Sequence, residues 1–492
     1  MKRLGRTAAV ALGAAAALFL ILTIPAPAPR VAGAPAGARA FAWNQDSLWE
    51  ALESAFVAAR AAGCTDSAGG LTGLRAPQRM IERLRRAPLP PSAPLLDSLE
   101  RGFFETAPLV AACPVALDDY VSLYARMREA IKWQSRHWDV TATDSRDRLY
   151  RSLYGGRAAV EEVMLQHPGR IAAILRGTDE PSAAPAAVVH GVELHSGDIL
   201  VSRGGYPTSA LIARGNDYPG NFSHVGLVHV DERTGEASVI EAHIEIGVAI
   251  ASFDQYLADK KLRLMLLRLR ADLPAVRRDP LLPHRAATAM LARARAGHIP
   301  YDFTMDYADP SRLFCSEVAS SAYHDVGVDL WMGISTISAA GLRRWLASFG
   351  VQHFETQEPS DLEYDPQLVV VAEWRDGESL FQDHMDNAVT DVMLEGAERG
   401  EALRFPWYTL PMARLAKAYG WGLELVGRTG PIPEGMTAAA ALRNQAYSER
   451  HRAASGRVRV EAEAWAAGRG YRPPYWTLIE LARAVGDGSP GR

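Results

Sequence analysis

The sequence predicts an α+β protein, in which a cluster of strands with helices on either side lies between two mainly helical regions. Three observations carry this prediction. Apolar residues recur at helical spacing before residue 178 and again after 355, short apolar runs typical of strands gather between about 190 and 270, and a helical pattern starts at Cys315. The length of 492 residues predicts two to four domains.

Residues 1–40 are typical of a bacterial export signal or of an uncleaved N-terminal membrane anchor. Three basic residues among the first six precede an apolar run from Ala8 to Ile24, and a stretch rich in Pro, Ala and Gly follows. Ala38-Arg39-Ala40 offers a cleavage site, but it lies far from the apolar run, so both alternatives stay open. Either one exports the rest of the chain, and we expect a periplasmic protein, soluble or anchored to the inner membrane.

Residues 41–178 are expected to form a helical N-terminal domain. Apolar residues at i, i+3 and i+4 predict helices over 46–62, 80–86, 98–104, 117–133 and 158–175. Cys64 follows one of these helical runs and Cys113 precedes another. Because an oxidising compartment permits the bond, we expect these two cysteines to form a disulfide, the alternative being two separate buried thiols.

A polar linker at 177–187 leads into the predicted catalytic domain, residues 190–350. Strands are expected over 198–202, 223–230, 238–250 and 262–269, with a turn at 231–235 and helices over 284–296 and from Cys315 onward. Residues 355–492 form a mainly helical C-terminal region, with one strand at 367–372 and helices over 379–399, 411–419, 438–465 and 475–485.

The charge balance argues against a nucleic-acid partner. The chain carries 53 Lys and Arg against 57 Asp and Glu, a net charge of −4, whereas a dedicated nucleic-acid binder needs a strongly basic surface. Three cysteines are too few for a disulfide scaffold. Because the number is odd, pairing Cys64 with Cys113 leaves Cys315 as a thiol to be explained.

Cys315 is a candidate nucleophile. Leu313 and Phe314 lead to it, and a helical pattern begins there, so the sulfur lies at or near a helix N-terminus. The partial positive charge of that end lowers a thiol pKa and favours the reactive thiolate. The competing interpretation is a buried, inert cysteine.

A thiol nucleophile needs a base, and the base needs a partner that orients it. His224 is the best base, because it shares a strand face with Gly226, which leaves room for a substrate. If the strands on either side of the 231–235 turn form a hairpin, Glu241 comes near His224 and can fix its tautomer. His243, on the same face as Glu241, is the alternative third residue.

A metal site competes with this triad. His224, Glu241, His243 and Glu245 could together surround zinc, but no H-E-x-x-H or C-x-x-C spacing is present. We therefore expect neither a metal nor another cofactor.

Four segments in this order carry a resemblance to a known family: HSGDILVSRG, FSHVGLV, VIEA and GHIPYDFTMDYADPSRLFCSEVASSAY. Over about residues 190–345 they resemble the permuted papain-like cysteine amidases, the NlpC-like group that includes YiiX and YebB-like proteins. In that group the histidine strand precedes the cysteine helix, as His224 precedes Cys315 here. The resemblance implies Cys315 as nucleophile, His224 as base, Glu241 as third polar residue, and Tyr301 beside the oxyanion or substrate groove. It also implies the fold, a small antiparallel, barrel-like sheet packed on the helix that begins at Cys315.

The resemblance and the predicted export together imply an enzyme, a cysteine amidohydrolase of the cell envelope. It would cleave an amide or ester bond, with cell-wall peptides as the first substrate class. Two alternatives stay open. One is a lipid acyl hydrolase or acyltransferase with the same triad, acting on an acyl or lipid substrate, and the other is a catalytically inactive envelope module that binds a partner.

Overall fold

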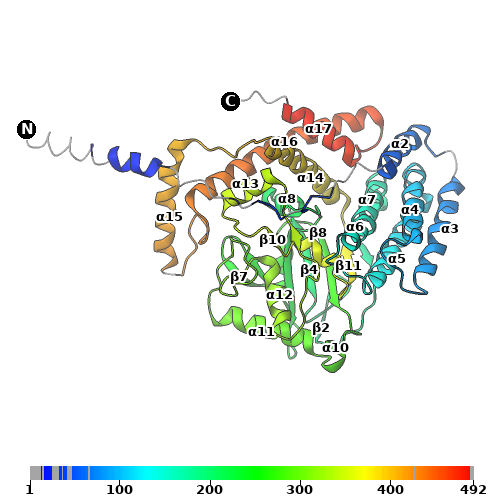
Figure 1. The fold of residues 1–492 in the computed structure, drawn as a ribbon, viewed down its shortest axis with the longest axis horizontal. Helices are drawn as coiled ribbons and strands as arrows, with labels where there is room; N and C mark the ends of the chain where they lie inside the picture. The colour runs from blue at the N-terminus through cyan, green and yellow to red at the C-terminus, as the bar shows by residue number, and fades with distance from the viewer. Residues whose placement is uncertain are drawn as a thin grey trace, which may run out of the picture.

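A computed structural model provides the structure of the chain (Figure 1). It describes residues 67–425 and 427–487 without a break, and before them residues 13, 16–24, 31, 33–35, 37–41 and 47–64. The basic start of the predicted export signal lies outside the described residues, whereas 16–23 of the predicted apolar run are helical. Among the described residues, no helix has the combination of length and apolar character that a transmembrane segment needs.

The centre of the fold is an antiparallel sheet with the strand order β1-β11-β8-β4-β5-β6-β7. Its strands are β1 (Ile174–Arg176), β4 (Ile199–Gly204), β5 (His224–Val230), β6 (Ala237–His243), β7 (Gly247–Ser252), β8 (Lys261–Leu269) and β11 (Leu368–Trp374). The sheet is open, so the predicted barrel-like sheet does not close. One edge strand, β1, is only three residues long, and at the other edge Val248 N–H donates to the carbonyl of Ile299 at 2.9 Å, outside the sheet.

The predicted strand over 238–250 is two strands. β6 ends at His243, the chain turns over 244–246, and β7 begins at Gly247. Gly247 has a φ of 71°, and a Cβ there would lie 2.1 Å from the carbonyl oxygen of Ile299, so this turn requires glycine. Glu245 therefore lies in the turn and not on the strand face that carries Glu241 and His243.

Alternate residues of the strands serve two apolar layers, as the two-residue period of a strand requires. Ile199 and Val201 pack in one cluster with α11 (Leu282–Ala296) and α12 (Cys315–His324), including Val318 and Ala319. Leu200 faces the opposite layer, which is built from α9 (Phe253–Ala258) and the hairpin of β2 (Ala186–Val189) and β3 (Val192–His195). The sheet that bears the predicted site is thus covered on both faces.

The two helical regions share one apolar core. The N-terminal helices are α2 (Ser47–Ala62), α3 (Ser67–Leu84), α4 (Pro94–Ala112), α5 (Leu117–Ser135), α6 (Thr143–Tyr150) and α7 (Gly156–Leu165). They pack in a single cluster with α13 (Ala340–Phe349), α14 (Gly377–Glu398), α16 (Ala438–Arg469) and α17 (Tyr475–Asp487). In Figure 1 these helices lie above and to the right of the sheet, and α15 (Leu410–Glu424) projects to the left.

The predicted domain boundaries stay a prediction, but elements cross them. Both β1 and β11 belong to the central sheet although they lie outside 190–350.

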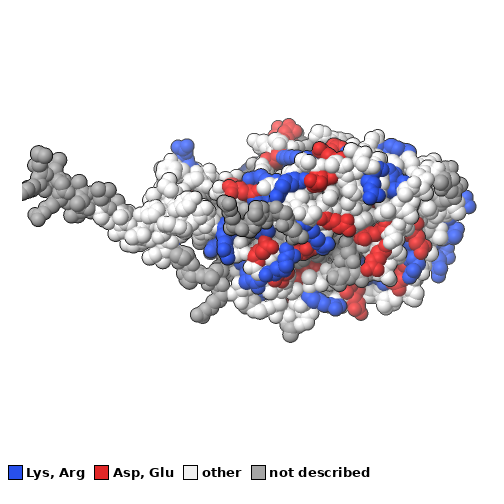
Figure 2. Space-filling model, turned by 90° about the horizontal axis from the view of Figure 1, so that it is seen from above, with Lys and Arg blue, Asp and Glu red and all other residues white. Residues whose placement is uncertain are grey.

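Seen from above, the globular body carries Lys and Arg interspersed with Asp and Glu, in keeping with the small net charge (Figure 2).

Buried ion pairs join the helical layer to the sheet. Arg157 of α7, 1% exposed, pairs with Glu363 and with Glu373 of β11, and Arg128 of α5 binds Glu373 at 2.9 Å. Burial alone would raise the pKa of Glu373, but its arginine neighbours hold that pKa well below the usual range. Breaking such a pair leaves an uncompensated buried charge, which costs about 3–5 kcal/mol.

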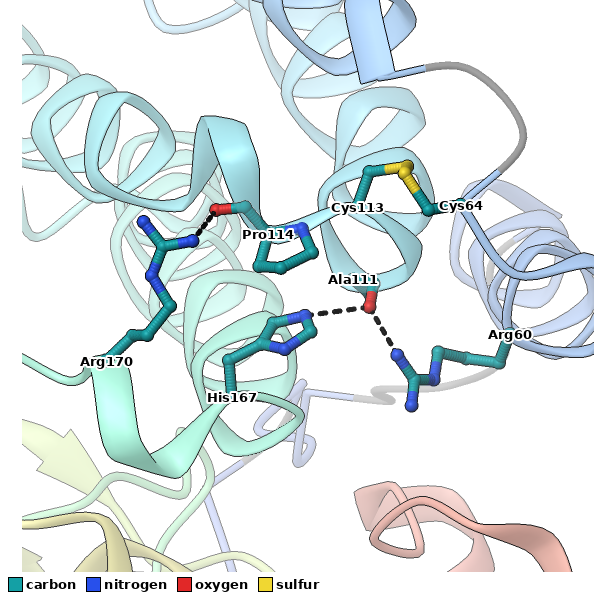
Figure 3. The surroundings of a disulfide bond; sticks show 7 residues. All are labelled: Arg60, Cys64, Ala111, Cys113, Pro114, His167 and Arg170. Carbon is teal, nitrogen blue, oxygen red and sulfur yellow. Dashed lines mark hydrogen bonds between the residues drawn. A yellow bond between two sulfur atoms is a disulfide. The ribbon is translucent and has the colours of Figure 1, made fainter.

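The structure joins Cys64 and Cys113 in a disulfide that connects the ends of α2 and α4, 49 residues apart in sequence (Figure 3). Beside it, the Ala111 carbonyl at the C-terminal end of α4 accepts hydrogen bonds from Arg60 at 2.6 Å and from His167 Nε2–H at 3.0 Å. These donors satisfy a carbonyl that the helix leaves without a partner. The third cysteine, Cys315, is free and buried.

Removing the disulfide should destabilise the protein. A closed loop of this length restricts the unfolded chain enough to stabilise the fold by about 3–4 kcal/mol. We expect the double variant Cys64→Ala/Cys113→Ala to lose that much free energy of unfolding in a urea titration. The matched control is Cys315→Ala, which removes a buried thiol and keeps the bond. Equal stability of the double variant and the control would contradict the prediction.

Candidate active site

Cys315 is the first residue of α12 and lies against the start of β5. Its Sγ is 3.9 Å from the carbonyl oxygen of Ser223, the residue before His224. The helix start is fixed by Glu317, whose carboxyl accepts a hydrogen bond from Phe314 N–H at 2.7 Å. The Leu313 N–H donates to the Pro300 carbonyl at 3.0 Å, which holds the Tyr301 segment beside the approach to the cysteine.

The Cys315 thiol is neutral in the resting protein. Burial raises its pKa to about 12, although the backbone N–H groups of Val225 and Ser316 and the Ser316 side chain act in the opposite direction. The prediction that the helix N-terminus lowers the pKa of Cys315 is therefore wrong. The residue is only 4% exposed, and burial destabilises its thiolate more than the neighbouring hydrogen bonds stabilise it. A reaction at Cys315 needs a base that removes the proton during attack.

Glu241 bridges the two histidines of the predicted site. His224 Nε2 lies 2.6 Å from Glu241 Oε2, and His243 Nε2 lies 3.1 Å from Glu241 Oε1. The hairpin of β5 and β6 sets this geometry, since Glu241 lies directly opposite Gly226, two residues beyond His224. Of the two candidates for the third residue, Glu241 is the one that hydrogen-bonds His224, whereas the His243 ring lies beside the His224 ring with 5.7 Å between centroids.

Charge and hydrogen bonds stabilise the ionised form of Glu241. Burial alone would raise the pKa of this carboxyl, but hydrogen bonds from His224 and His243 hold it well below its usual range. The same contact with Glu241 raises the pKa of His243, against the effect of its burial. A buried carboxylate at this place can orient the His224 ring and stabilise its protonated form.

These residues open onto one cavity of about 500 Å³. Cys315, His224, His243 and Tyr301 line it, and so do residues that lie far away in the sequence. The opposite walls come from Lys260 and Lys261, from α8 (Pro207–Arg214), and from α16 through Asn444, Ser448 and Arg452. Nothing in the sequence pattern of α16 distinguished its pocket-lining residues from the rest of a polar helix face.

Tyr301 reaches the cavity beside the nucleophile. It pairs with Leu313 in a short parallel bridge, and its ring packs edge-on against Phe303 with 5.0 Å between centroids. Burial raises its pKa well above the usual value, so the phenol stays protonated and can donate a hydrogen bond.

Lys261 brings a cation to the same cavity. Its side chain is 12% exposed, its Nζ lies 4.3 Å from the centre of the Tyr256 ring, and the Asp259 carboxylate is 3.8 Å away. Burial lowers its pKa, so holding its charge costs free energy that a bound anion would offset. In the part of the chain that the structure describes, no three His, Cys, Asp or Glu side chains lie together as they would around a metal ion.

Comparison with known proteins supports the resemblance that the sequence carries. Residues 193–372 match the family described as "Permuted papain-like amidase enzyme, YaeF/YiiX, C92 family". The match runs along the chain from β3 to β11 and includes α12, so this part of the chain is similar to a family of papain-like amidase enzymes. No curated protein and no solved structure matches the chain.

The Glu241 bridge predicts a specific titration behaviour. Replacing Glu241 with Gln removes the charged acceptor, so the raised pKa of His243 should fall toward the ordinary value of about 6.5, as measured by NMR of the imidazole signals. The stability that this contact contributes is present below pH 6.5 and is lost as the pH rises through the raised value. His324, whose pKa Asp329 raises at a distant exposed site, is the internal control and should not move. A His243 titration that Gln at 241 leaves unchanged would contradict this account.

Proposed function

We propose that the protein is a cysteine amidohydrolase in which Cys315 is the nucleophile, His224 the general base and acid, and Glu241 the residue that orients His224. One observation carries the proposal: the Glu241 carboxylate holds Nε2 of His224 at the wall of the cavity that Cys315 also lines. This contact leaves Nδ1 as the ring nitrogen that can take the proton of the thiol.

The first half-reaction forms an acyl-enzyme. His224 Nδ1 takes the proton from the Cys315 thiol while Sγ bonds to the carbonyl carbon of the substrate. The N–H of Cys315 at the helix start and the Tyr301 hydroxyl are the proposed donors to the oxyanion. The C–N bond then breaks, and the amine leaves with the proton from His224, which gives a thioester.

The second half-reaction hydrolyses that thioester. His224 takes a proton from water as the water oxygen bonds to the acyl carbon, and the C–S bond breaks to release a carboxylic acid. Sγ regains a proton from His224, which restores the neutral resting thiol. A negatively charged Glu241 stabilises the imidazolium that forms in both halves.

An envelope location fits this proposal. The Cys64–Cys113 disulfide is typical of an oxidising compartment, and the pattern of the N-terminal sequence is typical of an export signal or anchor. We propose a periplasmic protein, soluble or anchored to the inner membrane, that acts on cell-wall peptides. Those peptides carry free carboxylates, which match the cations Lys260, Lys261 and Arg452 on the cavity wall.

A lipid acyl substrate is the second candidate. Ile244, which lines the cavity, and Phe303, which packs on Tyr301, belong to an apolar cluster with residues of α15. An acyl chain leaving the cavity on this side would meet apolar surface. Product analysis with an acyl donor, with and without an added amine, distinguishes hydrolysis from transfer to an acceptor.

Substitutions at the triad should remove turnover. We expect Cys315→Ala and His224→Ala to reduce hydrolysis of a peptide amide to background, and Glu241→Gln to lower kcat by about 10²–10⁴-fold, because each removes a group that acts in the transition state. His229→Ala is the matched control, since it changes another histidine of β5 that does not line this cavity. Full activity of Cys315→Ala would overturn the proposal.

Lys261 should select for a negatively charged substrate. We expect Lys261→Met, which keeps the packing on Tyr256, to raise KM for a peptide amide with a free carboxylate by about tenfold, equivalent to about 1.4 kcal/mol. The same peptide with its carboxylate amidated is the control substrate, and its KM should not change. Equal effects on both peptides would show that Lys261 only supports the cavity wall.

A further inference from the structure

α15 is held to the body by one side only. Leu410 and Ala413 are buried with Ile432 and Met436, and Lys417 donates to the Pro433 carbonyl at 2.8 Å. The same cluster includes Ile244 and Phe303, which lie next to the active-site cavity. The helix is therefore fixed beside the mouth of the site, with its other side turned away from the body.

The outer face of α15 is apolar and exposed, apart from the contact of the Trp407 ring with Phe19. Tyr408, Met412, Leu415 and Tyr419 recur at helical spacing, and each is more than half exposed. The face as a whole comprises Trp407, Tyr408, Met412, Leu415, Tyr419, Trp421 and Leu425. In Figure 2 the projecting part is almost free of charged side chains, unlike the body. A contiguous apolar surface of this kind marks an interaction site on a soluble domain.

The N-terminal apolar run ends against this helix. The Arg414 guanidinium donates to the carbonyl of Leu22 at 2.8 Å and to that of Ile24 at 2.7 Å, and the Phe19 and Trp407 rings lie 6.4 Å apart. Leu18, Phe19, Leu20 and Ile21 are themselves exposed. The outer face of α15 is thus continuous with the described end of the predicted membrane anchor.

We propose that the outer face of α15 docks into the interface of a lipid bilayer, beside the N-terminal apolar run. Four of its seven side chains are Trp or Tyr, the residues that favour the headgroup region of a membrane. In the sequence, the apolar run of 17 residues from Ala8 to Ile24 follows a basic start, the pattern of an N-terminal membrane anchor. The only acidic residue of α15 is Glu424 in its last turn, so the earlier turns of the helix bring no negative charge to the bilayer.

Docking has a consequence for the active site that goes beyond amide hydrolysis. Because the cluster under α15 includes Ile244 and Phe303, a membrane-bound α15 holds the cavity at the bilayer surface. Substrates attached to the membrane or lying close to it would then have the shortest path to Cys315. A second copy of the chain, which could also cover an apolar face, is the alternative occupant that the experiment must distinguish.

The test uses the full chain with Cys315→Ala, so that its outcome is independent of catalysis. A single Met412→Cys in this background is labelled with an environment-sensitive fluorophore and reconstituted into vesicles of phosphatidylethanolamine and phosphatidylglycerol. The vesicles contain a lipid that carries a spin label near its headgroup. We expect this lipid to quench the fluorophore at position 412 at least twofold more than the same fluorophore attached at Val460→Cys. Val460 is the matched control, because it is an apolar residue of α16 with similar exposure that does not belong to the outer face.

A second variant keeps the result interpretable. Adding Leu415→Glu and Tyr419→Glu should reduce quenching at position 412 to the Val460 level, because charged groups resist burial in lipid, while the far-ultraviolet circular dichroism stays unchanged. Quenching at 412 no stronger than at 460 overturns the proposal. So does concentration-dependent self-quenching of the label without lipid quenching, which would assign the face to a second copy.

Discussion

The buried ion pairs between α7 and Glu363 and Glu373, the latter on β11, set the arrangement on which the rest depends. Arg157 is 1% exposed and pairs with Glu363 and Glu373. Moving α7 away from β11 would therefore leave a buried charge without its partner. A second set continues inward, where Arg263 of β8 binds Glu161 of α7 at 2.7 Å and also pairs with Asp383 of α14. Because α16 packs on α14, these charges fix the helix that forms one wall of the cavity.

Burial acts differently on Glu241 and on Cys315, two members of the proposed triad. Glu241 is buried but accepts hydrogen bonds from two imidazoles, so its charge is stabilised and it can hold His224 in one orientation. Cys315 is buried without a comparable partner, so its thiol keeps its proton. The Glu241 carboxylate therefore carries the negative charge of the site, and the Cys315 sulfur does not. In the proposed mechanism the proton passes to His224 during the attack itself, and a thiol that stays protonated between turnovers resists oxidation.

What the sequence could predict follows from local periodicity. Strand alternation put Glu241 and His243 on one face, the short turn at 231–235 implied the hairpin, and the change of pattern at Cys315 located the helix start. Contacts set by tertiary packing had no such signal. The break at Gly247 depends on the Ile299 backbone, the α16 wall depends on buried ion pairs, and the raised thiol pKa depends on burial that no linear pattern reports. Strand β1 joins the sheet through three residues, too few for any period to reveal.

The flanking regions are part of the site in this arrangement. α15 and α16 follow each other in the chain, so the proposed docking face and the cavity wall with Ser448 and Arg452 form one continuous unit. The cations Lys261 and Arg452 line a cavity beside which the apolar surface of α15 begins. A substrate with a charged end and an apolar end could satisfy both surfaces at once, because the charge would pair inside the cavity while the apolar part stayed in the membrane. The core that is similar to the permuted papain-like amidases would supply the proposed chemistry, and the surrounding helices would determine from which side a substrate reaches it.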